Sequence, residues 1–177
     1  MNIQADIDFL KAAIRDVPDF PKKGIVFKDI TTLLKDPVTF RRATDLLVVL
    51  CGGERADKVV AIESRGFILG SLVAHRLGMG FVPVRKPGKL PARTLKATYD
   101  LEYGTDSLEI HADALSAGER VLVLDDVIAT GGTARAVGEL TEKLGATVAA
   151  YAFLVELTFL NGREKLKGHK VLSLISY

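Results

Sequence analysis

The sequence has little cysteine, little net charge and no long hydrophobic run. Cys51 is its single cysteine, so no intrachain disulfide can form and a reducing cytoplasm is the natural setting. A formal charge of +2 on 177 residues is too small to indicate nucleic-acid binding. No apolar stretch is long enough to cross a membrane, and the first residues lack the basic and apolar regions of a signal peptide. We therefore expect a cytoplasmic protein that binds neither nucleic acid nor a membrane.

Low-complexity tracts and internal repeats are also lacking, whereas 48% of the residues are hydrophobic. A chain of this length can form one complete α/β core, so we expect a single domain over residues 1–177. Cys51 precedes two glycines at the end of a helix expected from Asp36-Pro37 to Leu50. We interpret it as a packing residue and not as a nucleophile.

The most informative stretch is 121–133, VLVLDDVIATGGT. Its four leading apolar residues favour a buried parallel strand, and ligands bind at the carboxyl ends of such strands. The glycines let backbone N–H groups approach a ligand, the threonines add hydroxyls, and a helix expected over 134–144 directs its positive end to the same place. The residues expected to bind a phosphate are Ala129, Thr130, Gly131, Gly132 and Thr133.

Asp125 and Asp126 stand between this strand and the loop, where they would repel a second phosphate. Carboxylates accept hydrogen bonds from ribose hydroxyls and bind hydrated Mg²⁺, so a sugar phosphate with a metal fits the stretch. The compound 5-phosphoribosyl 1-diphosphate (PRPP) has all these groups. The alternative is a solvated strand end followed by an ordinary helix-entry turn. No Lys follows the glycines, which excludes a Walker A loop, and the pattern is not GxGxxG.

This stretch closely resembles the PRPP-binding motif of type I phosphoribosyltransferases. A second strand, loop and helix follow the same plan at 58–62, ESRG and 67–77. Arg65 and the backbone N–H groups of ESRG favour an anion, although Arg65 paired with Glu63 is the alternative. The resemblance implies that Ser64 and Arg65 bind the pyrophosphate of PRPP.

The N-terminal region is expected to contain an amphipathic helix over Ile3 to Val17, ended by Pro18. The following residues, PDFPKKGIVFKDITTLL, resemble the hood of adenine phosphoribosyltransferases, so residues 1–35 are expected to be helix and base-binding hood. The alternative is a surface connector. The chain has Lys23 and Thr32 where the family often has proline, which affects the stiffness of the hood. The residues expected to bind the base are Val26, Phe27, which would stack on it, and Lys28.

Residues 85–111 follow a short strand expected over Phe81 to Val84 and are expected to form a mobile lid and an edge hairpin. A basic lid would attract phosphates and exclude water, although a solvated loop is the alternative. Its cations are Arg85, Lys86, Lys89, Arg93 and Lys96. Glu102 belongs to a Tyr-x-Leu-Glu-Tyr-Gly pattern in which, by resemblance, the Glu reaches the purine; alternatively it faces water.

Further strands are expected over Thr147 to Leu157 and Val171 to Ile175, with a short helix over Phe159 to Leu166 between them. Alternating strands and helices predict a doubly wound, mostly parallel α/β sheet flanked by helices. The hood and lid would then complete the type I phosphoribosyltransferase fold.

The resemblance to adenine phosphoribosyltransferases extends over most of the chain and implies a homodimer that converts adenine and PRPP to AMP and pyrophosphate with Mg²⁺. Arg65, Arg85, Lys86 and the metal would bind the leaving pyrophosphate. The implied catalytic residues are Glu102, Asp125, Asp126 and Arg65. One alternative is a phosphoribosyltransferase for xanthine, hypoxanthine, guanine or orotate. Another is a PRPP-sensing regulatory module, although no DNA-binding segment is visible.

Overall fold

The computed structural model describes residues 3–100 and 105–177, and the chain forms two compact units, Met1–Leu47 and Val48–Tyr177. Helix α3, Pro37–Cys51, crosses the boundary between them.

The first unit contains a β-hairpin that the helical pattern did not predict. Its other elements are helix α1, Ile3–Ala12, and helix α2, Thr31–Lys35. The predicted helix to Val17 is wrong beyond residue 12, because Arg15–Pro18 is strand β1, which pairs antiparallel with β2, Val26–Asp29. Cross-strand ion pairs join Arg15 to Asp29 and Lys28 to Asp16, at 2.5 and 2.6 Å. The pairing of β1 with β2 therefore overrides the helical spacing of the apolar residues in this segment.

The predicted start of α3 is confirmed. Asp36 Oδ1 accepts hydrogen bonds from the backbone N–H groups of Val38 and Thr39, at 3.0 and 2.9 Å, and Pro37 is the first helical residue. The helix ends at Cys51, which is fully buried. Burial, assisted by the charge of Glu54, raises the pKa of the Cys51 thiol to about 12. Cys51 is therefore a packing residue.

A five-stranded parallel sheet organises the second unit, in the order β4-β3-β7-β8-β9, and confirms the predicted fold class. Residues 121–124 are fully buried on β7, as their apolar run predicted. The strands are β3, Lys58–Ile62; β4, Gly80–Val84; β7, Arg120–Ile128; β8, Thr147–Glu156; and β9, Val171–Ser176.

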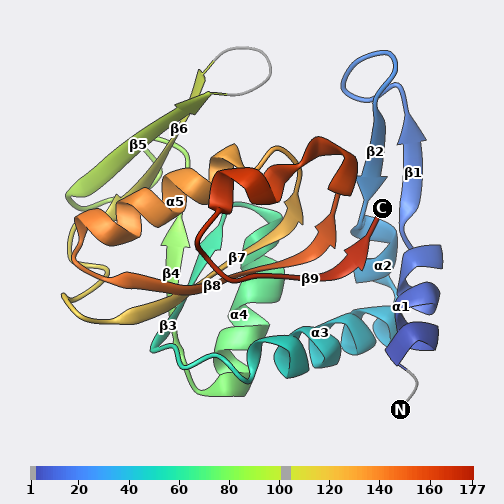
Figure 1. Ribbon diagram of the computed structural model, residues 1–177, viewed down its shortest axis with the longest axis horizontal. Helices are drawn as coiled ribbons and strands as arrows, with labels where there is room; N and C mark the ends of the chain where they lie inside the picture. The colour runs from blue at the N-terminus through green and yellow to red at the C-terminus, as the bar shows by residue number, and fades with distance from the viewer. Residues whose placement is uncertain (1–2, 101–104) are drawn as a thin grey trace. The chain divides into compact units, whose positions relative to one another are not determined.

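Two helices cover the sheet from opposite sides (Figure 1). Helix α4, Arg65–Leu77, packs on β3, β4 and β7, whereas α5, Gly132–Lys143, packs on β7 and β8. The connection from β3 leads outward to β4, and the connection from β7 leads the other way to β8. The direction in which successive strands are added to the sheet therefore reverses between β3 and β7. Open α/β sheets bind ligands at such a point.

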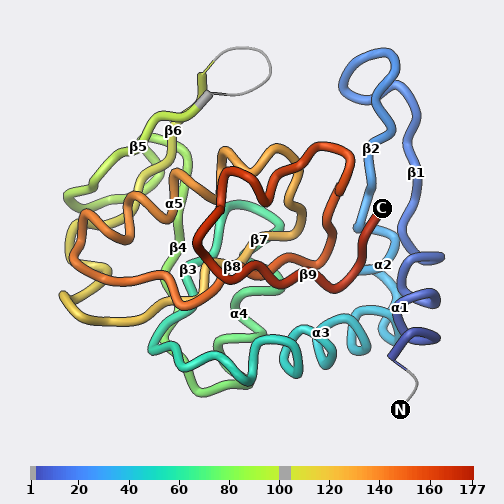
Figure 2. The backbone as a smooth tube through the Cα atoms, viewed as in Figure 1, coloured from blue at the N-terminus to red at the C-terminus, as the bar shows by residue number. Residues whose placement is uncertain are grey.

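The predicted hairpin is confirmed as β5, Thr94–Asp100, paired with β6, Thr105–His111. It forms a separate two-stranded sheet and adds no strand to the edge of the five-stranded one (Figure 2). The reason is packing: Leu108 and Ile110 are buried in the same core as Val137 of α5. Backbone hydrogen bonds between Arg85 and Glu109, at 2.9 and 2.7 Å, join β6 to the end of β4.

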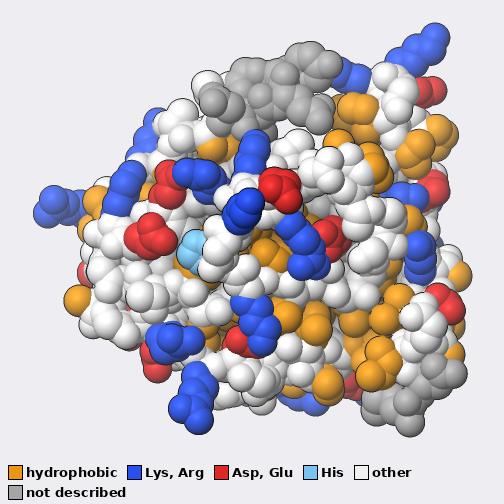
Figure 3. Space-filling model, in the orientation of Figure 1, with side chains coloured by type: hydrophobic (Ala, Val, Ile, Leu, Met, Phe, Trp, Pro, Cys, Tyr) orange, Lys and Arg blue, Asp and Glu red, His pale blue; other side chains and the backbone are white. Residues whose placement is uncertain are grey.

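Two short 3-10 helices, η1, Thr158–Leu160, and η2, Gly162–Leu166, replace the helix predicted between β8 and β9. Asn161 separates them with a positive φ of 52°. In the described ranges 3–100 and 105–177, no helix is long and apolar enough to span a bilayer. Acidic and basic side chains are interspersed on the face drawn in Figure 3.

Candidate active site

The two loops predicted to bind phosphates follow neighbouring strands. Strands β3 and β7 pair in parallel from Lys58↔Val121 to Ala61↔Leu124. Their carboxyl ends therefore lie at one edge of the sheet, where β3 leads into residues 63–66 and β7 into residues 129–133. The point between β3 and β7 where the direction of strand addition reverses thus has one predicted anion loop on each side.

Asp125 and Asp126 lie within β7, which continues to Ile128. The alternative of a solvated strand end is wrong, because Asp126 is only 5% exposed and Asp125 pairs with Phe153 of β8 in the sheet. Arg65, at the start of α4, forms an ion pair with Asp126. The guanidinium supplies the charge that a buried carboxylate needs.

Gly66 lets α4 approach Asp125 closely. A Cβ built on Gly66 would lie 2.9 Å from Asp125 Oδ1 and 3.1 Å from the carbonyl oxygen of Leu124, so a side chain has no room there. Burial, followed by the charge of Asp126, raises the pKa of Asp125 well above its ordinary value. Hydroxyl donors or a cation placed beside this carboxylate would favour its ionised form.

The phosphate loop leads directly into α5. Gly131 precedes the helix with a φ of +78°, a left-handed conformation that suits glycine, and no described side chain makes a capping hydrogen bond there. The first N–H groups of α5 therefore retain their capacity to bind an anion. Thr130 and Thr133 are partly exposed beside them.

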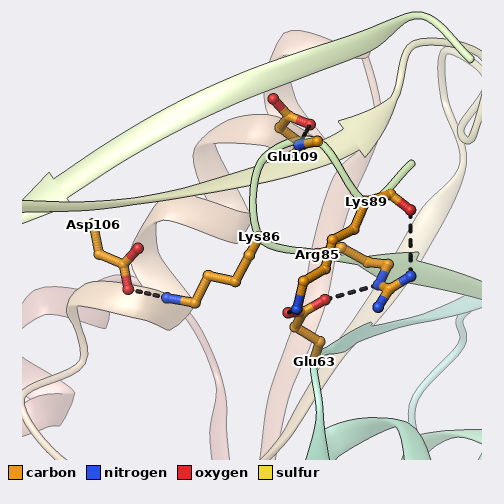
Figure 4. A network of polar contacts seen from close by, with 7 residues as sticks. Glu63, Arg85, Lys86, Lys89, Asp106 and Glu109 are labelled. Carbon is orange, nitrogen blue, oxygen red and sulfur yellow. Dashed lines mark hydrogen bonds and ion pairs between the residues drawn. The ribbon is translucent and has the colours of Figure 1, made fainter. Parts of the chain in front are cut away.

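The cations after β4 are held by acidic side chains (Figure 4). Glu63, whose side chain is 7% exposed, accepts from Arg85 Nε at 2.7 Å and from Lys89 Nζ at 2.6 Å. Burial would raise the pKa of Glu63, but the hydrogen bonds from Lys89 and Arg85 outweigh this and lower it. Lys86 forms an ion pair with Asp106 of β6.

These contacts gather Arg85, Lys86 and Lys89 between the end of β4 and the hairpin. The segment is further fixed by Gly88, whose N–H donates to Glu109 Oε2 at 3.1 Å. Three cations in so short a stretch form a site for a multiply charged anion, provided that the anion replaces the carboxylates.

The predicted base-binding residues lie on β2 of the first unit. Val26 is 46% exposed, and the ring of Phe27 packs edge-on against Phe20 with centroids 5.3 Å apart. Lys28 pairs with Asp16. Glu102 lies outside the described residues, between the ends of β5 and β6.

A Mg²⁺ site would have to use Asp125 and Asp126, which offer the hard oxygen donors that this ion prefers. The described part of the chain contains no cluster of three or more acidic, histidine or cysteine side chains able to hold a metal. Two carboxylates at a ligand-binding edge suit an ion held mainly by substrate oxygens and water.

Sequence reasoning missed three features of the site. It assigned no part to Asp106, it treated Glu63 only as a partner of Arg65, and it did not identify the close approach of Gly66 to Asp125. A glycine directly after an anion-loop arginine was the one available signal. Partners of long charged side chains depend on which strands become neighbours, which the spacing does not specify.

Comparison with known proteins agrees with this geometry. Residues 31–173 match the model of the phosphoribosyl transferase domain. A protein of Geobacter metallireducens named adenine phosphoribosyltransferase is 60% identical over 171 residues, which cover 97% of this chain and 100% of that protein.

Solved structures give the same result. Adenine phosphoribosyltransferase of Thermoanaerobacter pseudethanolicus has a TM-score of 0.94 and 54% identity, covering 97% of this chain and 99% of that chain. The Saccharomyces cerevisiae enzyme has a TM-score of 0.90 and 44% identity, with the same coverage. The chain therefore belongs to the phosphoribosyltransferase family and, within it, to the adenine phosphoribosyltransferases, which transfer the phosphoribosyl group of PRPP to adenine in purine salvage.

Proposed function

We propose that this chain forms AMP and pyrophosphate from adenine and PRPP through the residues described above. Residues 129–133 hold the 5′-phosphate, and the first turn of α5 supports its charge. Asp125 and Asp126 accept hydrogen bonds from the ribose hydroxyls. Phosphate binding orients the ribose C1 without taking part in bond breaking.

Attack on C1 releases pyrophosphate, so negative charge increases on the leaving group. Ser64 and the backbone of residues 63–66 bind it from one side, and Arg65, Arg85 and Lys86 supply positive charge. The pairing of Arg85 with Glu63 and of Lys86 with Asp106 supports this role, because each cation is already positioned by a carboxylate that an incoming anion can replace. Mg²⁺, when bound near Asp125, supplies further charge to the phosphates.

The base is assigned to the hood. Phe27 stacks on adenine, while backbone groups of Val26 and Lys28 pair with the exocyclic amino group and the ring nitrogen. Glu102 accepts a proton or a hydrogen bond from the purine as the nitrogen attacks. The Saccharomyces cerevisiae structure contains adenine together with an imino-altritol bisphosphate, which supports a base and a sugar phosphate as the ligands.

The observation that carries the proposal is the Asp125–Asp126 pair, of which Asp126 is buried, next to an uncapped, glycine-led helix start at the edge shared with the Arg65 loop. The test is PRPP-dependent conversion of labelled adenine, hypoxanthine, guanine and xanthine, run side by side. Preferred formation of AMP supports the proposal. Preference for an oxo purine, or PRPP binding without turnover with any base, would refute it.

We also propose that residues 1–177 act as one functional domain, that the protein is a cytoplasmic homodimer, and that residues 85–111 close as a lid. The single buried thiol is consistent with a reducing compartment. Analytical ultracentrifugation at assay concentrations tests the dimer, and an active monomer would exclude it.

A further inference from the structure

The phosphate loop rests against η2, a segment to which the mechanism assigns no part. Helices α5 and η2 pack together, and the red segment before β9 runs beside α5 in Figures 1 and 2. Gly162, the first residue of η2, is buried. The atoms that surround Gly162 determine how this contact affects the phosphate loop.

The backbones of the loop and of η2 touch through two glycines. A Cβ added to Gly131 would lie 2.2 Å from the carbonyl oxygen of Gly162. A Cβ added to Gly162 would lie 2.3 Å from the carbonyl oxygen of Ala129 and 2.9 Å from Cγ1 of Ile128. Because the obstructing atoms include backbone oxygens, a larger residue at either position must displace one of the two segments.

A bidentate ion pair between Arg163 and Glu156 fixes η2 to the sheet. Arg163 donates from Nε and Nη2 to the two carboxylate oxygens of Glu156, both at 2.6 Å. Its Nη1 donates to the carbonyl oxygen of Val171 and its Nη2 to Ser173 Oγ, both at 2.9 Å. Ser173 Oγ in turn donates to Glu156 Oε2 at 2.5 Å. A two-point pair restricts orientation as well as distance, so η2 is tied to the ends of β8 and β9.

The pair is also ionised under ordinary conditions. The hydrogen bond from Arg163 lowers the pKa of Glu156 despite the burial of this carboxylate, whose side chain is 8% exposed.

A backbone hydrogen bond also joins the end of β8 to the start of the phosphate loop: Leu157 donates its N–H to the carbonyl oxygen of Ile128 at 3.0 Å.

We propose that Gly162 and Arg163 are positioning residues for the 5′-phosphate loop. Gly162 fixes the path of residues 129–131 by direct backbone contact, and Arg163 fixes Gly162 by anchoring η2 to Glu156 and Ser173. The inference rests on the proposed function, because that function assigns the 5′-phosphate to this loop. Neither residue is required to touch the phosphate.

The test compares AMP with adenosine, which lacks the phosphate, in calorimetric titrations of the full-length chain. In Gly162→Ala and Arg163→Met, AMP affinity should fall about 10- to 100-fold, because small displacements of a positioning group have effects of this order. Adenosine affinity should stay within about twofold, because adenosine has no phosphate for the loop to bind, and a tenfold change for AMP is clearly larger than that. Arg163→Lys should recover part of the loss, because it keeps the charge but not the two-point geometry.

Two variants serve as controls. Gly53→Ala adds a methyl group where nothing lies within 4 Å, and Lys170→Met removes the Lys170–Glu54 ion pair at 2.5 Å. Both should bind AMP normally. Equal losses for AMP and adenosine in the Arg163 variants, or no loss at all, would overturn the proposal, and this holds even where Gly162→Ala fails to fold. A wild-type chain that binds AMP no better than adenosine would instead refute the proposed function.

Discussion

The loop after β7 and the cationic segment after β4, both in the second unit, are built differently. The loop after β7 is shaped by backbone contacts, with Gly131 packed against Gly162 and with Asp126 buried in the sheet before it. The cations after β4 are long side chains, and Glu63 and Asp106 hold them through ion pairs. We therefore expect the loop after β7 to be preorganised and the cations after β4 to exchange their carboxylate partners for an anion. This difference suits a phosphate that stays with the product and a pyrophosphate that must leave.

Replacing both aspartates of β7 tests the preorganised site at the end of this strand and should have the largest effect. In Asp125→Asn/Asp126→Asn, turnover should fall roughly 10²- to 10³-fold, the range for loss of a preorganised electrostatic group. Arg65 would also lose the charge of its partner Asp126. Steady-state kinetics over a series of Mg²⁺ concentrations measures the change. Asp113→Asn, at an exposed position, is the matched control, and normal kinetics in the double variant would contradict the assignment.

Removing a cation tests the segment after β4, whose cations are expected to exchange carboxylate partners for an anion. Arg85→Met should weaken pyrophosphate binding about tenfold, because a charge-assisted contact with an anion contributes roughly 1.5–3 kcal/mol. AMP affinity should change little. Arg41→Met, at an exposed position of α3 outside the lid, provides the control. Titration with inorganic pyrophosphate and with AMP separates the two sides, and an equal loss for both ligands would remove the distinction between them.

Removing a carboxylate partner should act in the opposite direction. Asp106→Asn frees Lys86 from its internal partner, so pyrophosphate affinity should rise about 1.4- to fivefold, corresponding to the ~0.2–1 kcal/mol of a partly exposed ion pair. The gain should diminish at high salt, which screens such charges. A fall in affinity would mean that Asp106 is needed to position Lys86.

The smallest effect concerns pH. Because the pKa of Glu63 is lowered in the folded state, its ion pairs contribute stability above its unfolded pKa, and this contribution is lost as pH falls through the lower folded value. The acid branch of a stability curve should therefore be shallower in Glu63→Gln, whereas the slope between pH 6 and 8 should not change. Thermal unfolding in a pH series measures both, and identical acid branches would exclude the linkage.

The sequence predicted the strands of the parallel sheet and the start of α3 well, because they depend on local patterns. The strand over Lys58 to Ile62 and the cap at Asp36 have the expected positions, since an apolar run and an Asp-Pro start are local signals. The helix expected through Val17 failed because the partner strand of residues 15–18 begins only at Val26. Contacts such as Gly131 with Gly162 join distant segments, so no spacing within either segment indicates them.

The pairing of β3 with β7 has a consequence for how the molecule forms. These strands are neighbours in the sheet, although α4, β4 and the whole hairpin separate them along the chain. Contacts between segments so far apart in sequence form slowly, because the intervening chain must first be closed into a loop. The distance between the loops that follow β3 and β7 is therefore set by a long-range contact, the pairing of these two strands. A nascent chain released before residue 121 would contain the Arg65 loop but no partner strand β7 for β3.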